Sequence, residues 1–356
     1  MKITGVIVEY NPLHNGHKLH IEKIKETNPD LIIGVMSSSF TMRGDLSIFD
    51  KFKKTKQALK LGIDIVIELP LLLSMQRADI FAKNAVDLLN LMKVNNIIIG
   101  SELNDISLYE KEYNNEILNQ DIKKSMKENS SLINFDSNDT LGYFYYKAIK
   151  DSNYNITLDT IKRLNSSYKE LTPNNNSITS AMAIRNDLSL LKDYSPSFVY
   201  EDKEYILDED KLFNYIKYQI LSKDIKDLKD IFFVDEGIEY KLKDIKDFNN
   251  LNDFINYLSG KKYTKTRIKR MLIYILLNVK KETINNINNA SFIRILGYSN
   301  KGKEYINKIK KDVNIYSNIK EGINTILDIE LKTSKIIDTI FNTNIFNQEQ
   351  KGPIRN

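Results

Sequence analysis

The stretch MKITGVIVEYNPLHNGHKLH, residues 1–20, decides the fold that the sequence predicts. It contains all three histidines of the chain, which are His14, His17 and His20. Residues 3–8 are apolar and largely β-branched, which predicts a buried strand. Asn11-Pro12 interrupts this run, and the apolar spacing after Gly16 predicts an amphipathic helix. Unpaired N–H groups and the helix dipole at such a turn attract phosphate.

The four residues His14-Asn15-Gly16-His17 match the HxGH signature of nucleotidyltransferases. There, two imidazoles donate hydrogen bonds to the phosphates of ATP while its α-phosphate is displaced. We therefore predict that His14 and His17 are catalytic and that Gly16 leaves room for the ligand. Two alternatives remain open: imidazoles three positions apart can share a metal ion, and histidines can simply cap or pack. We assign no metal ligand, because the chain has no cysteine and His14 precedes the helix.

The composition is that of a globular protein large enough for two domains. The chain has 356 residues, of which 42% are hydrophobic and 28% charged. The absence of cysteine excludes disulfides, thiolate metal sites and thiol catalysis. No signal peptide and no apolar stretch of membrane-spanning length is evident, so we expect a cytoplasmic protein without a membrane partner.

Short apolar runs alternate with helical patterns through the first half of the chain. Strands are predicted at residues 31–36, 64–69, 96–99 and 156–161, and residues 49–61 are predicted as a basic helix. This rhythm predicts an α/β fold with a parallel sheet covered by helices on both faces. Ligands would bind at the carboxyl ends of the strands, where His14, Ser37, Pro70 and Gly100 fall.

The strand rhythm is lost after residues 194–197, which predicts a boundary between domains 1–195 and 196–356. The second half is predicted to be mostly helical, with helices at residues 211–221, 251–259, 264–279 and 301–311.

A second phosphate-binding element is predicted just before this boundary. Thr179 and Ser180 stand at a helix start, and Arg185 follows a turn and a half later. Together with the histidine loop they would clamp the β and γ phosphates from the opposite side. The alternative is an ordinary helix cap followed by a surface arginine.

Positive charge is concentrated in residues 260–311, which carry fourteen Lys and Arg against two Glu, a net charge of +12 in a protein of +5. Tyrosines are interleaved, so bases could stack there. A solvated helix face is the alternative, although mixed signs would then be expected. We assign nucleic-acid binding to Lys261, Lys262, Lys265, Arg267, Lys269 and Arg270.

Six segments, in order from residue 1 to about residue 311, resemble the tRNA(Met) cytidine acetate ligase family. They are GVIVEYNPLHNGHKLH (5–20), VMSSSFTMRGDLSIFDK (35–51), IDIVIELP (63–70), IIIGSE (97–102), KKYTKTRIKRMLIYILLN (261–278) and FIRILGYSNKGKEY (292–305). The resemblance implies a Rossmann-like nucleotidyltransferase domain followed by a helical, basic domain that holds tRNA. It also implies a bacterial enzyme that uses ATP and acetate to form N4-acetylcytidine at the wobble position of elongator tRNA(Met), through an acetyl-adenylate.

The resemblance implies an ATP site made of one loop and three separate residues. These are Ile7, Val8, Glu9, Tyr10, Asn11, Pro12, Leu13, His14, Asn15, Gly16, His17, Lys18, Leu19, His20, Gly100, Asn138 and Arg163. Asn138 as a helix cap and Arg163 as a surface charge are the alternatives. Magnesium is expected with the triphosphate.

Two other functions remain open at this point. An adenylyltransferase that acts on a small phosphorylated metabolite would account for the N-terminal half but would leave the basic segment without a role. A non-enzymatic RNA-binding protein would leave the HNGH loop without one.

Overall fold

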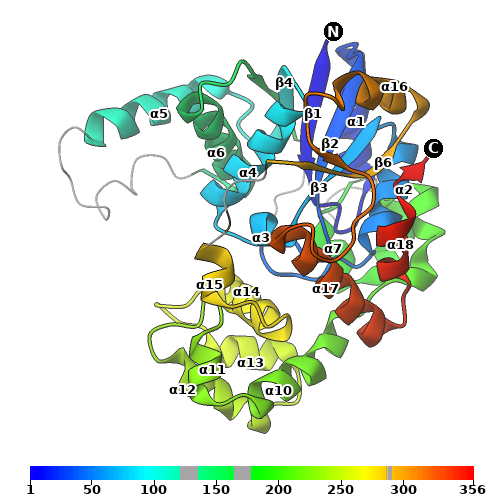
Figure 1. The fold of residues 1–356 in the computed structure, drawn as a ribbon. Coiled ribbons are helices and arrows are strands. Elements are labelled where there is room, and N and C mark those ends of the chain that lie inside the picture. The colour runs from blue at the N-terminus through cyan, green and yellow to red at the C-terminus, as the bar shows by residue number, and fades with distance from the viewer. Residues whose placement is uncertain (121–134, 164–177, 286, 288–290) are drawn as a thin grey trace.

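A computed structural model describes residues 1–120, 135–163, 178–285, 287 and 291–356. In this part of the chain eight strands form one sheet in the order β5-β4-β1-β2-β3-β6-β7, with β8 beside β6 (Figure 1). Their bounds are β1 Ile3–Val8, β2 Leu31–Ser37, β3 Ile65–Leu69, β4 Asn96–Ser101, β5 Thr157–Lys162, β6 Ile293–Tyr298, β7 Ile315–Tyr316 and β8 Ile354–Arg355. None of the helices described is both long and apolar enough to span a bilayer.

The first five strands form the parallel sheet that the sequence predicts. Every ladder among them is parallel, and the helices that connect them cover both faces. Alternate strand side chains fill two cores, because successive residues of a strand point to opposite faces. The helices of this half are α1 Asn15–Glu26, α2 Lys51–Leu61, α3 Leu71–Ser74, α4 Ala78–Leu91, α5 Ile106–Gln120 and α6 Ser137–Asp151. Val6 and Ile32 pack with α1 and α2, whereas Ile33 and Ile97 pack with α4 and α6.

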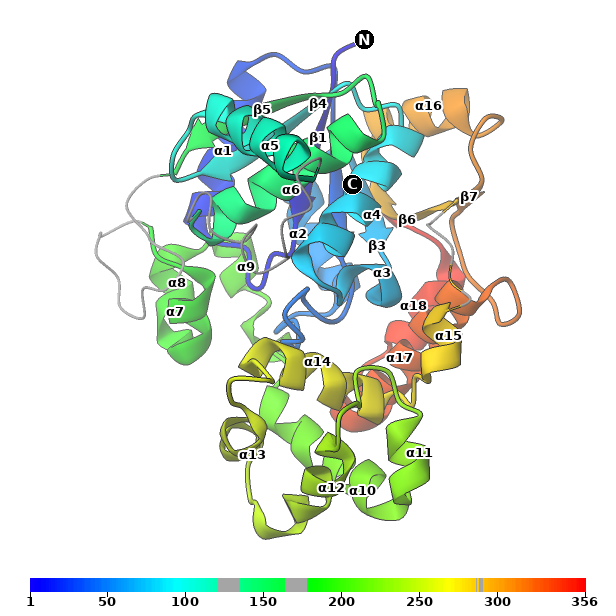
Figure 2. The ribbon, with the colours of Figure 1, turned by 90° about the vertical axis from the view of Figure 1, so that its left-hand side faces the viewer.

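A group of helices follows and lies beyond the carboxyl ends of the strands (Figure 2). It comprises α10 Leu212–Ser222, α11 Ile225–Lys229, α12 Ile238–Leu242, α13 Leu251–Leu258 and α14 Lys265–Leu276. Three short helices lead into it: α7 Ala181–Asn186, α8 Leu191–Tyr194 and α9 Ser197–Tyr200. Tyr274 of α14 fixes the group to the sheet domain by donating from its hydroxyl to the Met75 carbonyl (2.9 Å). The boundary near residue 195 stays a prediction.

The chain then returns to the sheet, which the sequence analysis did not predict. β6 pairs antiparallel with β3, so Ile65 lies opposite Tyr298. α15 Lys281–Asn285 still contacts the group of helices, since Lys281 donates to the Lys229 and Val234 carbonyls. The elements of the return are β6 to β8 together with α16 Asn300–Ile309, α17 Thr325–Phe341 and α18 Ile345–Lys351. β6 was missed because it is a single short run that contains a charged residue, Arg294, whose buried partner Glu349 is remote in the sequence.

A buried ion cluster fastens this returning segment to α2. The Lys51 ammonium contacts three carboxylates, at 2.6 Å from Glu68, 3.0 Å from Glu330 and 2.5 Å from Glu349. The Arg294 guanidinium lies 3.1 Å from Glu349. Burial, and next the neighbouring Glu330, raises the pKa of Glu68 to about 8. Buried charges of this kind are tolerated only when they are paired, so the cluster depends on all its members.

Replacing Lys51 with Met should therefore destabilise the fold strongly, because three buried carboxylates would lose their shared cation. We expect a loss of about 3–5 kcal/mol in the free energy of unfolding, measured by chemical denaturation. The matched control is Lys23→Met, which removes the exposed Lys23–Glu26 pair on α1 and should change stability by less than about 1 kcal/mol. Equal effects of the two substitutions would contradict the prediction.

Candidate active site

The segment between β1 and α1 is held in place by the amide of Asn11. Its Nδ2 donates to the Leu46 carbonyl (3.0 Å), and its Oδ1 accepts from the Ile48 N–H (2.8 Å). Both ends of this buried amide are thus bonded to one neighbouring segment. The chain turns there, and α1 begins at Asn15 with its N-terminus at the carboxyl ends of the strands.

His14 and His17 cap the start of α1 reciprocally. The Nδ1 of His14 accepts from the Gly16 N–H (3.1 Å), and the Nδ1 of His17 accepts from the His14 N–H (3.2 Å). The two rings stack with centroids 3.8 Å apart. Because each Nδ1 acts as an acceptor, the proton of each neutral ring lies on Nε2. Both imidazoles therefore offer an Nε2–H donor.

Glycine is required at position 16 by the ring of His14. A Cβ there would lie 2.8 Å from the Cε1 of that ring, closer than van der Waals contact allows. A side chain at this position would displace the imidazole, and with it the cap. The predicted role of Gly16 in admitting a ligand stays a prediction.

All three histidines are neutral at physiological pH. Burial, with smaller contributions from Arg163 and Arg185, lowers the pKa of His14 to about 3. Burial, and next His14, lowers the pKa of His17 well below its ordinary value. Burial and Arg163 lower the pKa of His20 to about 4, and its Nε2 has no hydrogen-bond partner among the described residues.

A cavity of about 250 Å³ lies at the carboxyl ends of β1, β4 and β5. Thirteen residues of the predicted ATP site line it: Ile7, Val8, Glu9, Tyr10, Asn11, His14, Gly16, His17, Leu19, His20, Gly100, Asn138 and Arg163. Pro12, Leu13, Asn15 and Lys18 are not among its lining residues. The residues that the family resemblance pointed to separately, at positions 100, 138 and 163, thus meet the histidine loop in one cavity.

Glu102 joins the remote members of this set. Its Oε1 accepts from the Nδ2 of Asn138 (2.6 Å) and lies 3.1 Å from the Nε of Arg163. Gly100 is in close contact with the Arg163 side chain, since a Cβ added at position 100 would be 3.3 Å from the Arg163 Cγ. The alternative role of Asn138 as a helix cap is wrong, because Asp136 occupies the N-cap of α6.

The three residues of the second predicted phosphate-binding element lie in three different environments. Ser180 caps α7, its Oγ accepting from the Ala183 N–H (3.0 Å), and it lines the cavity. Arg185 also lines the cavity and donates to the Asn11 carbonyl. Thr179 is buried outside the lining, and its Oγ1 has no partner among the described residues. Phosphate binding by the three stays a prediction.

The six basic residues predicted to bind nucleic acid form two sets. Lys261, Lys262 and Lys265 are exposed. Arg267 is partly exposed and stacks over the Tyr263 ring, with its Cζ 4.5 Å from the ring centroid. Lys269 and Arg270 face the cavity wall: Lys269 pairs with Asp45, and the Arg270 Nε donates to the Met42 carbonyl (2.7 Å).

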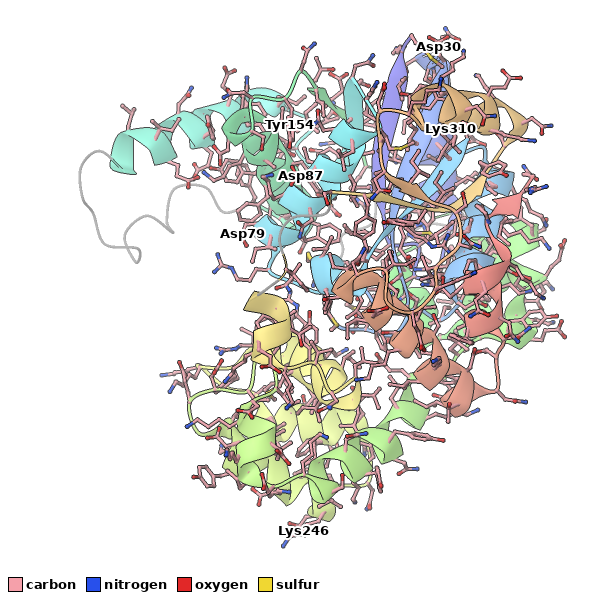
Figure 3. The ribbon with its side chains drawn as sticks, viewed as in Figure 1. Asp30, Asp79, Asp87, Tyr154, Lys246 and Lys310 are labelled. Atoms are coloured by element: carbon pink, nitrogen blue, oxygen red, sulfur yellow. The ribbon has the colours of Figure 1, made fainter. Side chains whose placement is uncertain are left out.

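The lysines of α16, which belong to the same basic segment, lie at the opposite end of the sheet. Ser299, the N-cap of α16, bonds Asp64 just before β3, and Tyr305 donates to the Met92 carbonyl just after α4. Figure 3 shows Lys310 at the same end of the molecule as Asp30, which precedes β2. The +12 segment therefore supplies the site only through its first part.

Several cavity residues were not assigned from the sequence. They are Thr41, Met42, Arg43 and Asp45 on one wall and Phe81, Leu141 and Tyr145 on another. In the segment 35–51 the sequence analysis placed Ser37 at the carboxyl end of a strand and predicted a helix from residue 49, but it assigned no site residue among residues 41–45. Nothing in its residue types indicated which of its side chains would face the cavity.

The comparisons with known proteins agree with this geometry. A family model described as HIGH Nucleotidyl Transferase matches residues 1–352. A tRNA(Met) cytidine acetate ligase of Clostridium perfringens is 35% identical, covering 94% of this chain and 94% of its own length. The ligase of the same name from Bacillus subtilis is 32% identical, covering 94% and 92% of the two chains.

Two solved structures of Thermotoga maritima TmcAL are also similar. The apo form superposes with a TM-score of 0.84 at 26% identity, covering 100% of this chain and 99% of that one. The form bound with alpha-thio ATP superposes with a TM-score of 0.80 at 25% identity and the same coverage.

The lowered pKa of His14 should make stability depend on pH. The unfolded histidine titrates near pH 6.5 and the folded one at about 3, so the unfolded chain binds more protons between these values. Stability should fall by about 1.4 kcal/mol per pH unit from this group as the pH drops through that window. His14→Asn, which keeps an N-cap acceptor, should show a shallower loss in urea denaturation between pH 7 and pH 5. Identical slopes for the two proteins would refute a neutral His14.

Proposed function

The chain belongs to the tRNA(Met) cytidine acetate ligase family of HIGH nucleotidyltransferases, and we infer that it is an ATP-dependent ligase that acetylates a cytidine of methionine tRNA. Its product is N4-acetylcytidine at the wobble position of the elongator tRNA. We place the enzyme in the cytoplasm, where its tRNA substrate resides.

One observation carries this proposal: two neutral imidazoles at a helix N-terminus direct Nε2–H donors into a cavity that also contains Arg163 and Arg185. Such donors can bind a triphosphate without first losing a proton, and they strengthen as negative charge grows. The helix N-terminus adds its dipole to the same end of the cavity. The site thus suits displacement at the α-phosphate of ATP.

In the first step, an oxygen of acetate attacks the α-phosphorus, and the bond from that phosphorus to the β-phosphate oxygen breaks. Acetyl-adenylate and pyrophosphate form, and the electron pair leaves with pyrophosphate. We assign the growing charge to the imidazoles of His14 and His17 and to the Arg185 guanidinium. Arg163, Asn138 and Gly100 would hold the nucleoside end, at the carboxyl ends of β4 and β5.

Magnesium fits the triphosphate chemistry but is not assigned to residues of this chain. Among the residues that the structure describes, no group of three or more His, Asp or Glu side chains could hold a metal ion. Mg²⁺ commonly binds through substrate phosphates with few protein ligands.

The transfer to RNA is assigned to the side of the cavity that faces α14. The cytosine amine is a poor nucleophile, which is why the acetate must be activated first. An anticodon loop is unpaired, so its base can be turned toward a buried adenylate at low cost. The exposed lysines before and at the start of α14 would hold the phosphate backbone nearby.

The direct test is mass spectrometry of methionine tRNA incubated with this protein, ATP and acetate. We expect one added acetyl group at the wobble cytidine, dependent on both small substrates. ATP–pyrophosphate exchange should depend on acetate and not on phosphorylated metabolites. Exchange stimulated by a phosphorylated metabolite, with unmodified tRNA, would instead indicate an adenylyltransferase.

Charge reversal should separate tRNA binding from adenylation. Lys261→Glu combined with Lys265→Glu is expected to weaken tRNA binding about tenfold and to reduce its salt dependence, while acetate-dependent exchange persists. The control, Lys308→Glu with Lys310→Glu on α16, changes the net charge equally at the other end of the sheet. Equal weakening by both pairs would show a response to net charge alone.

A further inference from the structure

The carboxylate of Glu9 follows β1 directly and lies on the wall of the cavity. Its Oε1 accepts from the Met42 N–H (2.6 Å) and from the Ser37 hydroxyl (3.3 Å). Its backbone carbonyl accepts from the buried Lys54 ammonium (3.0 Å). Side chain and main chain are thus both fixed, which gives this carboxylate one defined orientation.

The wall that contains Glu9 is contacted by α14, the helix beside which we place the RNA. We assign the nucleoside end of the cavity to Gly100, Asn138 and Arg163, whereas Glu9 is bonded to the Met42 N–H of the segment 41–45. That segment is also contacted by α14, through Arg270 and Lys269. A base that arrives from α14 would therefore meet the cavity at the wall of Glu9.

Few other cavity groups can accept a proton. The imidazoles of His14 and His17 use each Nδ1 as an acceptor of a backbone N–H and carry a proton on Nε2. Burial and Arg163 lower the pKa of the third imidazole, His20, to about 4, which makes it a weak base. Asp45 is paired with Lys269. Burial raises the pKa of the Tyr10 and Tyr145 phenols, which therefore stay protonated. Among the lining side chains of the described residues, Glu9 is the carboxylate without a cationic side-chain partner within ion-pair distance.

We propose that Glu9 is the general base of acetyl transfer, accepting a proton from the N4 amine of the target cytidine. The amine nitrogen attacks the carbonyl carbon of acetyl-adenylate and forms the C–N bond. The bond from that carbon to the phosphate oxygen breaks, AMP leaves with the electron pair, and the amine proton passes to Glu9. This step rests on the proposed function and adds a second role to the same cavity.

The environment of Glu9 makes its carboxylate a stronger base than an exposed one. Burial raises its pKa, while the Met42 N–H and the Lys54 ammonium oppose the shift, and Asp45 and Arg43 act in opposite directions. Tyr145, from α6, is the other titratable group close to it. A carboxylate with a pKa above its ordinary value accepts protons more strongly than an exposed one.

The test uses Glu9→Gln, whose amide oxygen can still accept from the Met42 N–H. Single-turnover transfer from synthetic acetyl-adenylate to methionine tRNA is compared with acetate-dependent ATP–pyrophosphate exchange. We expect the ratio of transfer to exchange to fall at least about 100-fold. The acid limb of the transfer rate, present in the wild type, should disappear. An equal fall of both activities, or no fall, would overturn the proposal.

Ser37→Ala provides a second test that keeps the carboxylate. Loss of the Ser37 hydroxyl removes a donor that favours the charged form, so the acid limb of transfer should move to higher pH. An unmoved limb would count against Glu9 as the titrating base. Wild-type enzyme that supports exchange but never acetylates tRNA would refute the proposed function itself, which is a separate result.

Discussion

The site depends on one buried ammonium group, that of Lys54 on α2. It donates to the carbonyls of Glu9 (3.0 Å), Ser37 (2.9 Å) and Ser38 (2.9 Å) and to the Ser47 hydroxyl (2.9 Å). These acceptors end β1, end β2 and continue into the segment that forms the cavity wall. Burial lowers the pKa of Lys54 to about 7, so these partners offset its desolvation only in part. The wall of the cavity is thus built around the buried amino group of Lys54.

The cost of burying charge also explains why the histidines are neutral. Arg163 and Arg185 already make the cavity positive, and they help to lower the pKa of His14. Protonated imidazoles stacked 3.8 Å apart would repel each other and the arginines. Neutral rings avoid this repulsion and still donate from Nε2. We therefore assign the binding of negative charge to the Arg185 guanidinium and directed hydrogen bonds to the imidazoles.

The sequence predicted the parts of this protein that depend on local pattern. The apolar run of β1, the turn and the HNGH start of α1 are contiguous, and the alternation of strands and helices predicted the parallel sheet. The sequence did not predict features that depend on contacts between residues far apart in the chain. Glu102 gains its role only because Asn138 and Arg163 reach it, and β6 can bury Arg294 only against Glu349. The basic segment 260–311 is continuous in the sequence but forms two separate surfaces in the structure, because β6 leads the chain from α14 to the far end of the sheet.

α2 contains two lysines whose partners lie far from it in the sequence. Its lysines predicted a basic helix, yet Lys51 and Lys54 are fully buried, and they lie three positions apart on the same helix face. Lys54 holds the ends of β1 and β2, whereas Lys51 holds Glu330 and Glu349 of the returning C-terminal segment. Glu330 in turn accepts from the Ser38 hydroxyl (3.2 Å), in the loop whose carbonyl Lys54 binds. The C-terminal helices are therefore connected to the back of the cavity wall through three side chains. This connection gives a physical reason for the chain to return to its first sheet after building the helices that we assign to tRNA.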